Sequence, residues 1–120
     1  MNDPRIPLFS YGTLQQPEVQ LANYGRLIDA EPDVLLGYEL QPLLIEDPHV
    51  VALSGKSVHM IARPAGSATA RIVGAVLMLT EAELEASDTY EEQSYKRVKA
   101  RLESGRMAFV YVGEPDAARA

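Results

Sequence analysis

The chain has 120 residues, close to the commonest size of a single domain, and its 47% hydrophobic and 23% charged residues are typical of globular proteins. Seventeen acidic against eleven basic residues give a formal net charge of -6, the wrong sign for a protein that must neutralise nucleic-acid phosphates. We therefore expect one domain over residues 1–120, with its core at about 6–112, a loose tail at 114–120 and no nucleic-acid partner.

Cysteine is absent, which excludes disulfides, thiolate metal sites and a cysteine nucleophile. No apolar run approaches the roughly 18 residues needed to cross a bilayer, and the first residues lack the apolar stretch of a secretory signal. The sequence thus favours a cytoplasmic protein with no membrane partner.

The first segment with a clear pattern is the apolar run Ile6–Ser10, which ends at Tyr11-Gly12. A run of this length bounded by glycine predicts a buried strand. Next, Pro17 suits a first helical turn and Gly25 a helix stop, so the sequence predicts a short helix over Pro17–Tyr24.

The middle of the chain, Val34–His59, is apolar but punctuated by glycine and proline, a pattern that predicts short strands and turns. In Ala70–Leu79, the last eight residues carry only apolar side chains and glycine. This segment is expected to be a central strand buried on both faces, with Ser57–Arg63 as its hairpin partner across the turn Pro64–Ser67.

The clearest local signal is a helix start at Glu81. Thr80 and Glu83 fit a capping box, and Leu79 and Leu84 fit the hydrophobic staple around it. We expect this helix to end before the next segment of alternating apolarity, which follows Tyr95.

Two alternating segments, Val98–Leu102 and Met107–Val112, predict a closing hairpin. The basic residues near its start alternate along the first strand, as on an ordinary solvated face; they are Lys96, Arg97, Lys99 and Arg101. With about six or seven strands and two short helices, the chain is expected to be an α+β protein with a small, mixed, largely antiparallel sheet, curled or closed into a β-barrel.

One candidate site is the turn Tyr11-Gly12-Thr13-Leu14. A strand that stops at glycine and turns towards a helix leaves backbone N–H groups unpaired, and such a nest binds anions or carbonyl oxygens. The alternative is that Gly12 only permits a tight turn. The further glycines and lysine of a P-loop are missing, so a nucleoside triphosphate is not supported.

The other candidate is the acidic and aromatic stretch Asp88–Glu92. Acidic residues near a helix are usually solvated, but a carboxylate becomes a useful general base when burial and its neighbours raise its pKa towards neutrality. Glu91 stands beside Tyr90 and Glu92 and four residues from Tyr95.

The histidines and serines do not suggest a site. The ten-residue spacing of His49 and His59 implies no shared face for a metal ion. Ser10 and Ser57 lack the G-x-S-x-G turn of a hydrolase nucleophile, so no Ser-His-acid triad is predicted.

Taken together, the sequence resembles the γ-glutamylcyclotransferase and AIG2-like family, which includes the γ-glutamylamine cyclotransferases. The resemblance runs over roughly residues 7 to 112. It rests on short pieces in the right order: Phe9–Leu14, Val73–Val76, Asp88–Glu91, Tyr95–Val98, Ser104-Gly105 and Val110–Val112.

The resemblance implies a γ-glutamylcyclotransferase-like fold and an enzyme that cyclises a γ-glutamyl amino acid or γ-glutamylamine to 5-oxoproline, releasing the amine. It implies that Glu91 is the general base and then acid, that no metal or cofactor takes part, and that Tyr95 is a further pocket contact. The substrate-holding loop would be Tyr11, Gly12, Thr13 and Leu14.

Two positions depart from the family pattern: Ser87 replaces a common leucine, and Glu92 replaces a glycine. They leave open a non-catalytic small-ligand-binding domain on the same scaffold, or a different acyl transfer in the same cavity. The released amine and the oligomeric state are not determined by the sequence.

Overall fold

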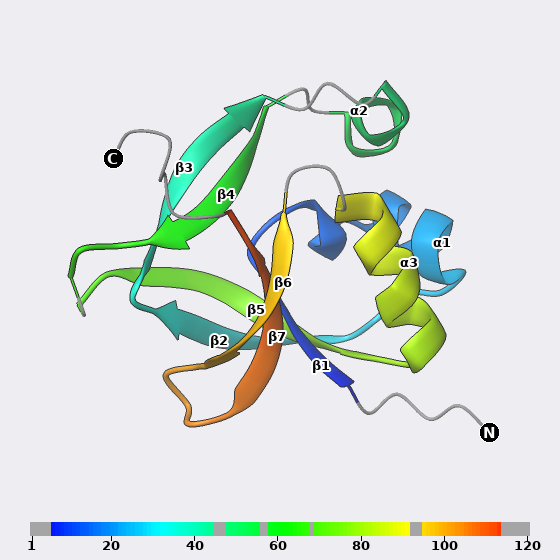
Figure 1. Cartoon of the computed structure of the whole chain (residues 1–120). Helices are drawn as coiled ribbons and strands as arrows, with labels where there is room; N and C mark the ends of the chain where they lie inside the picture. The colour runs from blue at the N-terminus through cyan, green and yellow to red at the C-terminus, as the bar shows by residue number, and fades with distance from the viewer. Residues whose placement is uncertain (1–5, 45–47, 56–57, 68, 92–94, 114–120) are drawn as a thin grey trace.

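The fold is an open, strongly bent sheet of seven strands with helices packed against it (Figure 1). The computed structural model describes residues 6–44, 48–55, 58–67, 69–91 and 95–113. In chain order the elements are β1 (Ile6–Ser10), the 3-10 helix η1 (Thr13–Gln15), α1 (Pro17–Tyr24), β2 (Ala30–Leu36), β3 (Tyr38–Leu44), α2 (Pro48–Ser54), β4 (Val58–Pro64), β5 (Arg71–Leu79), α3 (Glu81–Glu91), β6 (Lys96–Arg101) and β7 (Met107–Val112).

Strands β2 and β3 are two parts of one bent strand, and β4 and β5 form its bent antiparallel partner (Figure 1). At the corner, the Gly37 N–H donates to the Ala70 carbonyl at 2.9 Å, and the Gly37 carbonyl accepts from the Ala65 N–H at 3.0 Å. Gly37 has φ +82°, a conformation that glycine adopts without steric cost. Backbone pairing therefore continues around the bend.

This corner corrects one prediction. Residues 57–63 do not form a hairpin with residues 70–79, because β4 pairs with β3 and β7 while β5 pairs with β1 and β2. After Pro64 the chain turns a corner and continues along the bent strand formed by β2 and β3. In a hairpin it would instead fold back onto β4. A short proline- and glycine-containing loop is compatible with both outcomes.

The strand order is β2-β5-β1-β7-β4-β3, with β6 paired to β7 as well. Pairings of β7 with β1 and with β4 are parallel and the others antiparallel. Strand β1 ends at Ser10, and β4 takes its place beside β7 at Ala62. The mixed, largely antiparallel α+β architecture is confirmed, but the sheet stays open and does not close into a barrel.

The core is split between the two faces of the sheet, because consecutive strand residues point to opposite sides. In β1, Phe9 belongs to a cluster made of strand and hairpin residues, whereas Leu8 belongs to a second cluster shared with α1 and α3. The bend lets the first cluster be enclosed by the sheet itself, and the helices cover the second (Figure 1). Strand β5 is central, but Val73 near its start is 77% exposed, so only its later part is buried on both faces.

Helices α1 and α3 begin and end as the sequence predicts. Gly25 closes α1 in the left-handed conformation at φ +70°. At the start of α3 the capping box is confirmed, because the Glu83 N–H donates to Thr80 Oγ1 at 3.1 Å and the Thr80 N–H donates to Glu83 Oε1 at 2.9 Å. Glu83 also forms a two-pronged salt bridge with Arg26, at 2.6 and 2.8 Å, which fastens α3 to the segment after α1.

Helix α2 is the element that sequence reasoning missed. Its signals resemble those of α1, with Pro48 at the first helical position and Gly55 after the end at φ +73°. The β-branched pair Val50-Val51 and the nearby prolines favoured strands and turns instead.

The closing hairpin of β6 and β7 is confirmed. The predicted loose tail, residues 114–120, lies outside the described residues. Among the helices that the structure describes, none is both long and apolar enough to span a bilayer.

Candidate active site

A pocket of about 250 Å³ opens where β1 ends and the chain turns into η1. This volume is slightly below the roughly 300–1,000 Å³ of typical ligand sites, so it suits a small metabolite. Its walls come from the 9–16 segment, the end of α3 and the strands β4 and β7. The lining residues are Phe9, Ser10, Tyr11, Gly12, Thr13, Leu14, Gln16, Met60, Glu91, Tyr95 and Tyr111.

Gly74 in β5 lies against Phe9 and Ser10, two residues of the pocket lining. A Cβ atom there would lie 2.4 Å from the Ser10 carbonyl oxygen and 2.7 Å from Phe9 Cζ, closer than real Cβ contacts. Glycine therefore lets the end of β1 and the Phe9 ring lie directly against β5.

The turn after β1 provides unpaired backbone donors. In η1 the Gln15 N–H donates to the Gly12 carbonyl at 3.2 Å, and the Gln16 N–H donates to the Thr13 carbonyl at 2.9 Å. The N–H groups of Thr13 and Leu14 have no acceptor among the described residues, as expected for the first residues of a helical turn. Two donors of the nest are thus free for a ligand beside the pocket.

Tyr11 fixes this turn to the sheet through its hydroxyl. The hydroxyl donates to the Tyr111 carbonyl of β7 and accepts from the Ala62 N–H of β4 at 2.9 Å. It therefore joins β4 to β7 at the point where β1 leaves the sheet. Burial raises the pKa of Tyr11, so the group remains a neutral phenol. Its ring lines the pocket, but its hydroxyl is engaged with the backbone.

Glu91 is the last residue of α3 and the charged residue of the pocket lining. Desolvation by burial raises its pKa to about 8. Its place at the negative end of a helix dipole acts in the same direction. Within the described part of the chain, no cation forms a salt bridge with it to lower the pKa. This carboxyl group therefore exchanges a proton near neutral pH.

Glu91 interacts electrostatically with tyrosines from five different segments of the described chain. Burial is the main cause of the raised pKa of each of them, and the Tyr24 pKa reaches about 12. Neutral phenols add no charge near neutral pH, so the surroundings of Glu91 stay weakly polar. They are Tyr11, Tyr24, Tyr90, Tyr95 and Tyr111.

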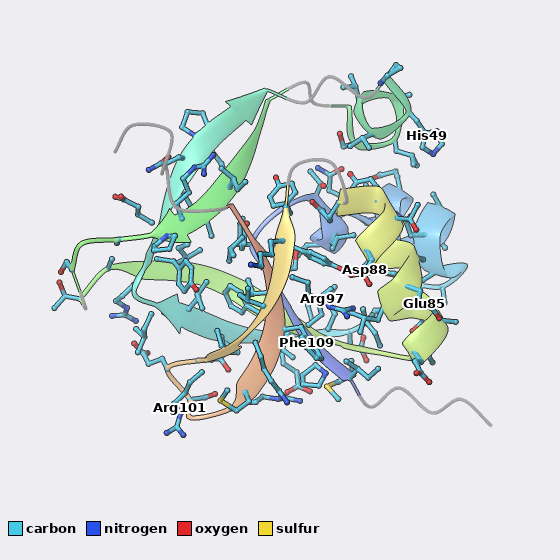
Figure 2. All side chains as sticks on the ribbon, viewed as in Figure 1. His49, Glu85, Asp88, Arg97, Arg101 and Phe109 are labelled. Carbon is cyan, nitrogen blue, oxygen red and sulfur yellow. The ribbon has the colours of Figure 1, made fainter. Side chains whose placement is uncertain are left out.

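Asp88 is one helical turn before Glu91 and holds the end of α3 against the sheet. The Tyr111 hydroxyl of β7 donates to Asp88 Oδ1 at 2.7 Å, and Arg97 Nη1 of β6 donates to Asp88 Oδ2 at 2.9 Å. The Arg97 guanidinium also lies 4.9 Å from the centre of the Phe109 ring. Figure 2 shows Arg97 reaching from β6 towards Asp88, whereas Arg101 lies at the far end of the strand. Asp88 of the Asp88–Glu91 piece and Arg97 of the Tyr95–Val98 piece are therefore structural partners.

Tyr90 and Tyr95 link the end of α3 to the segments around it, and of the two Tyr95 lines the pocket. The Tyr90 and Thr13 hydroxyls share a 2.8 Å hydrogen bond, which links α3 to the turn. The Tyr95 hydroxyl donates to the Met60 carbonyl at 3.1 Å, which links the residue after α3 to β4. The predicted base Glu91 and the predicted contacts Tyr11–Leu14 and Tyr95 all line this pocket, whereas Asp88 and Tyr90 do not.

The pocket also contains residues that sequence reasoning did not assign to it. Gln16, Met60 and Tyr111 line it, and no local motif distinguishes them. Only Tyr111 has a sequence signal, as a member of an alternating strand whose buried face meets α3.

The remaining notable residues lie elsewhere. His49 is exposed on α2, as Figure 2 shows, and the His59 side chain, Ser57 and Glu92 lie outside the described residues. Ser87 is fully buried, and its hydroxyl shares a 2.6 Å hydrogen bond with that of Tyr24. Nowhere in the described ranges do three potential metal-ligating side chains gather.

Comparison with known proteins decides the family. The model of the family described as "Gamma-glutamyl cyclotransferase, AIG2-like" matches residues 8–120, nearly the whole chain. The chain belongs to the gamma-glutamyl cyclotransferase, AIG2-like family. Membership supports a cyclotransferase enzyme acting on a small molecule, at the level of the family. No curated protein matches the sequence.

Solved structures share the fold of this AIG2-like chain. The solution structure of At3g28950.1 from Arabidopsis thaliana has a TM-score of 0.67 at 23% identity, covering 94% of this chain and 65% of that one. At5g39720.1 from the same plant has a TM-score of 0.69 at 24% identity, covering 90% and 68%. The uncharacterized human protein loc79017 has a TM-score of 0.66 at 14% identity, covering 92% and 68%. This AIG2-like chain therefore spans about two thirds of their length, and at these identities the likeness is one of fold alone.

Proposed function

We propose that this protein cyclises a γ-glutamyl compound, either a γ-glutamyl amino acid or a γ-glutamylamine, to 5-oxoproline and a free amine. The observation that carries the proposal is one small pocket lined both by Glu91, a carboxyl group with a raised pKa, and by a turn with free N–H groups. Family membership supports the reaction class.

The first step is deprotonation of the substrate. The α-ammonium group of a γ-glutamyl compound must lose a proton before its nitrogen attacks the γ-carbonyl carbon of the same molecule. Burial raises the pKa of Glu91 to about 8, which brings it much nearer to the pKa of an amine than the 4.5 of an unperturbed glutamate. Transfer of the proton from the substrate ammonium group to the Glu91 carboxylate therefore costs less free energy than transfer to an ordinary carboxylate, which favours Glu91 as a general base.

The second step returns the proton. Attack forms the ring C–N bond and places negative charge on the γ-carbonyl oxygen. As the bond from carbon to the departing nitrogen breaks, Glu91 in its acid form gives its proton to that nitrogen. The ring nitrogen still carries a second proton, which Glu91 accepts and passes to the released amine, so the products are the lactam and an ammonium ion. One carboxyl group serves each transfer, and no net proton is gained or lost by the enzyme.

The turn holds the substrate in the folded conformer. Attack is intramolecular, so positioning is the main contribution required of the protein. The free N–H groups of Thr13 and Leu14 are suited to bind the substrate α-carboxylate or the developing oxyanion. Gly12, the Tyr11 ring and Tyr95 complete the walls of the pocket.

The test is direct detection of product. Purified protein is incubated with a panel of γ-glutamyl amino acids and γ-glutamylamines, and 5-oxoproline is measured by mass spectrometry. We expect at least one productive substrate, and Glu91→Gln is expected to lower turnover by about a hundredfold or more while leaving binding largely intact.

Glu85→Gln is the matched control, because Glu85 is exposed on the same helix and lies away from the pocket lining (Figure 2). Ligand-induced thermal stabilisation without 5-oxoproline would point to the non-catalytic binding domain instead. Full turnover by Glu91→Gln would exclude the assigned base.

A further inference from the structure

Tyr90 lies between the two halves of the proposed site. It precedes Glu91 in the last turn of α3, and its hydroxyl shares a 2.8 Å hydrogen bond with Thr13 Oγ1 in the turn. The same hydroxyl is hydrogen-bonded to Ser54, the last residue of α2. One phenol on α3 therefore contacts two segments, the turn and α2, that are far from it in the sequence.

The contact with Thr13 is the direct side-chain link between base and turn in the described residues. Asp88 fastens α3 to β6 and β7, and the Tyr11 hydroxyl fastens the turn to β4 and β7. Each of these anchors joins one half of the site to the sheet. Among the side-chain bonds of the described residues, the bond from Tyr90 to Thr13 joins the residue next to Glu91 directly to a pocket-lining residue of the turn.

The surroundings of this bond favour a fixed geometry. Thr13 is buried, and the Tyr90 ring packs against the apolar cluster beneath the helices. A hydrogen bond between two such hydroxyls is directional and is not replaced easily by water. Thr13 also carries one of the free N–H groups of the turn.

We propose that Tyr90 is a positioning residue, whose hydroxyl bond to Thr13 sets the placement of Glu91 relative to the substrate-holding turn. The inference rests on the proposed function for its catalytic consequence. Its structural content, that the bond keeps the Glu91 carboxyl in the pocket, stands independently of any substrate.

The catalytic test uses Tyr90→Phe, which keeps the ring and removes the hydroxyl, and Thr13→Val, which keeps the shape of Thr13. Each is expected to lower kcat for 5-oxoproline formation about tenfold or more with a smaller change in KM, because a small misplacement of the base slows proton transfer. The double variant is expected to be no slower than the slower single one, since both remove the same bond. Thr13→Ser, which retains the hydroxyl, is expected to restore most of kcat.

Tyr38→Phe is the matched control. It removes the hydroxyl of a half-buried tyrosine on β3 that packs on the other apolar cluster and lies outside the pocket lining. We expect its kcat to stay within about twofold of the wild type. An equal loss of kcat in Tyr38→Phe and Tyr90→Phe would show a general packing effect and overturn the proposal.

The structural test needs no substrate. The Glu91 side chain is titrated by carboxyl-carbon NMR in the wild type, Tyr90→Phe and Tyr38→Phe. The midpoint is expected to fall by about one pH unit in Tyr90→Phe, because a loosened helix end admits water, and to stay unchanged in Tyr38→Phe. Should Tyr90→Phe not fold, Thr13→Val tests the same bond from the other side.

The two readouts separate the two ideas. A wild type that forms no 5-oxoproline refutes the proposed function. The titration then tests by itself whether the bond from Tyr90 to Thr13 keeps Glu91 in the pocket. An active wild type whose Tyr90→Phe variant keeps both kcat and the Glu91 midpoint refutes the positioning role and leaves the proposed function standing.

Discussion

The Tyr111 hydroxyl on β7 donates a 2.7 Å hydrogen bond to Asp88 on α3, one turn before Glu91. Arg97 on β6 holds the other oxygen of the same carboxylate. The last turn of α3 is thereby fixed to the sheet by a charged, two-sided contact, and Glu91 is placed over the pocket as a consequence.

This clamp leads to the first prediction. Asp88→Asn keeps the size of the side chain but removes its charge, so both bonds weaken. We expect a loss of about 1 kcal/mol in the free energy of unfolding, measured by urea titration. Arg71→Met is the control, because the Arg71–Glu103 salt bridge is exposed and is expected to contribute close to zero. Equal effects of the two substitutions would refute the clamp.

The second prediction concerns Gly74, against which the end of β1 packs. Gly74→Ala forces a methyl group against the Ser10 carbonyl and the Phe9 ring. We expect destabilisation by about 2 to 4 kcal/mol in thermal or urea unfolding. Gly66→Ala is the matched control, because open space surrounds that position and its φ is not positive, so a change below about 0.5 kcal/mol is expected. A tolerated Gly74→Ala would contradict the close approach of β1 and β5.

The third prediction follows from the raised pKa of Glu91. Its pKa in the folded chain, about 8, exceeds the 4.5 of an unperturbed glutamate, so the folded state binds the proton more tightly. Stability contributed by this group is therefore complete below about pH 4.5 and is lost as the pH rises towards 8.

Glu91→Gln removes this loss. The variant is expected to match the wild type at pH 4.5 and to exceed it by about 1 to 3 kcal/mol at pH 8, in urea titrations run across this range. Thr89→Ala, which changes no charge at an exposed position on the same helix, is expected to show no such dependence. A pH-independent difference between Glu91→Gln and the wild type would mean that the carboxyl is not desolvated.

The fourth prediction concerns the rate. If Glu91 must accept a proton, kcat/KM for 5-oxoproline formation is expected to rise about tenfold per pH unit below pH 7 and to level off above about pH 8. The measurement is kcat/KM from initial rates in well-buffered solutions across this pH range, with a check of enzyme stability at each pH. A plateau already reached at pH 6 would assign the proton transfer to a group with an ordinary carboxyl pKa.

Local chemistry determined several elements from the sequence alone. The limits of β1 and α1 and the start of α3 follow from short-range signals: glycine and proline at the ends, and a capping box between Thr80 and Glu83. The composition and the ordered short motifs also indicated an α+β domain of the right family. Such signals act within a few residues, so they are legible without knowledge of the rest of the fold.

Tertiary structure decided how those elements pair, which residues meet at the pocket and which groups are buried. Nothing within residues 57–79 distinguishes a hairpin from the corner that keeps β4 beside β3 and β7, because the choice depends on partners far along the chain. The same holds for the pocket: the motif residues Asp88, Arg97 and Tyr90 are brought into their roles by partners on β7, α3 and η1. Burial of Glu91 is likewise a property of the assembled fold, since a carboxyl loses its water only when distant segments close around it.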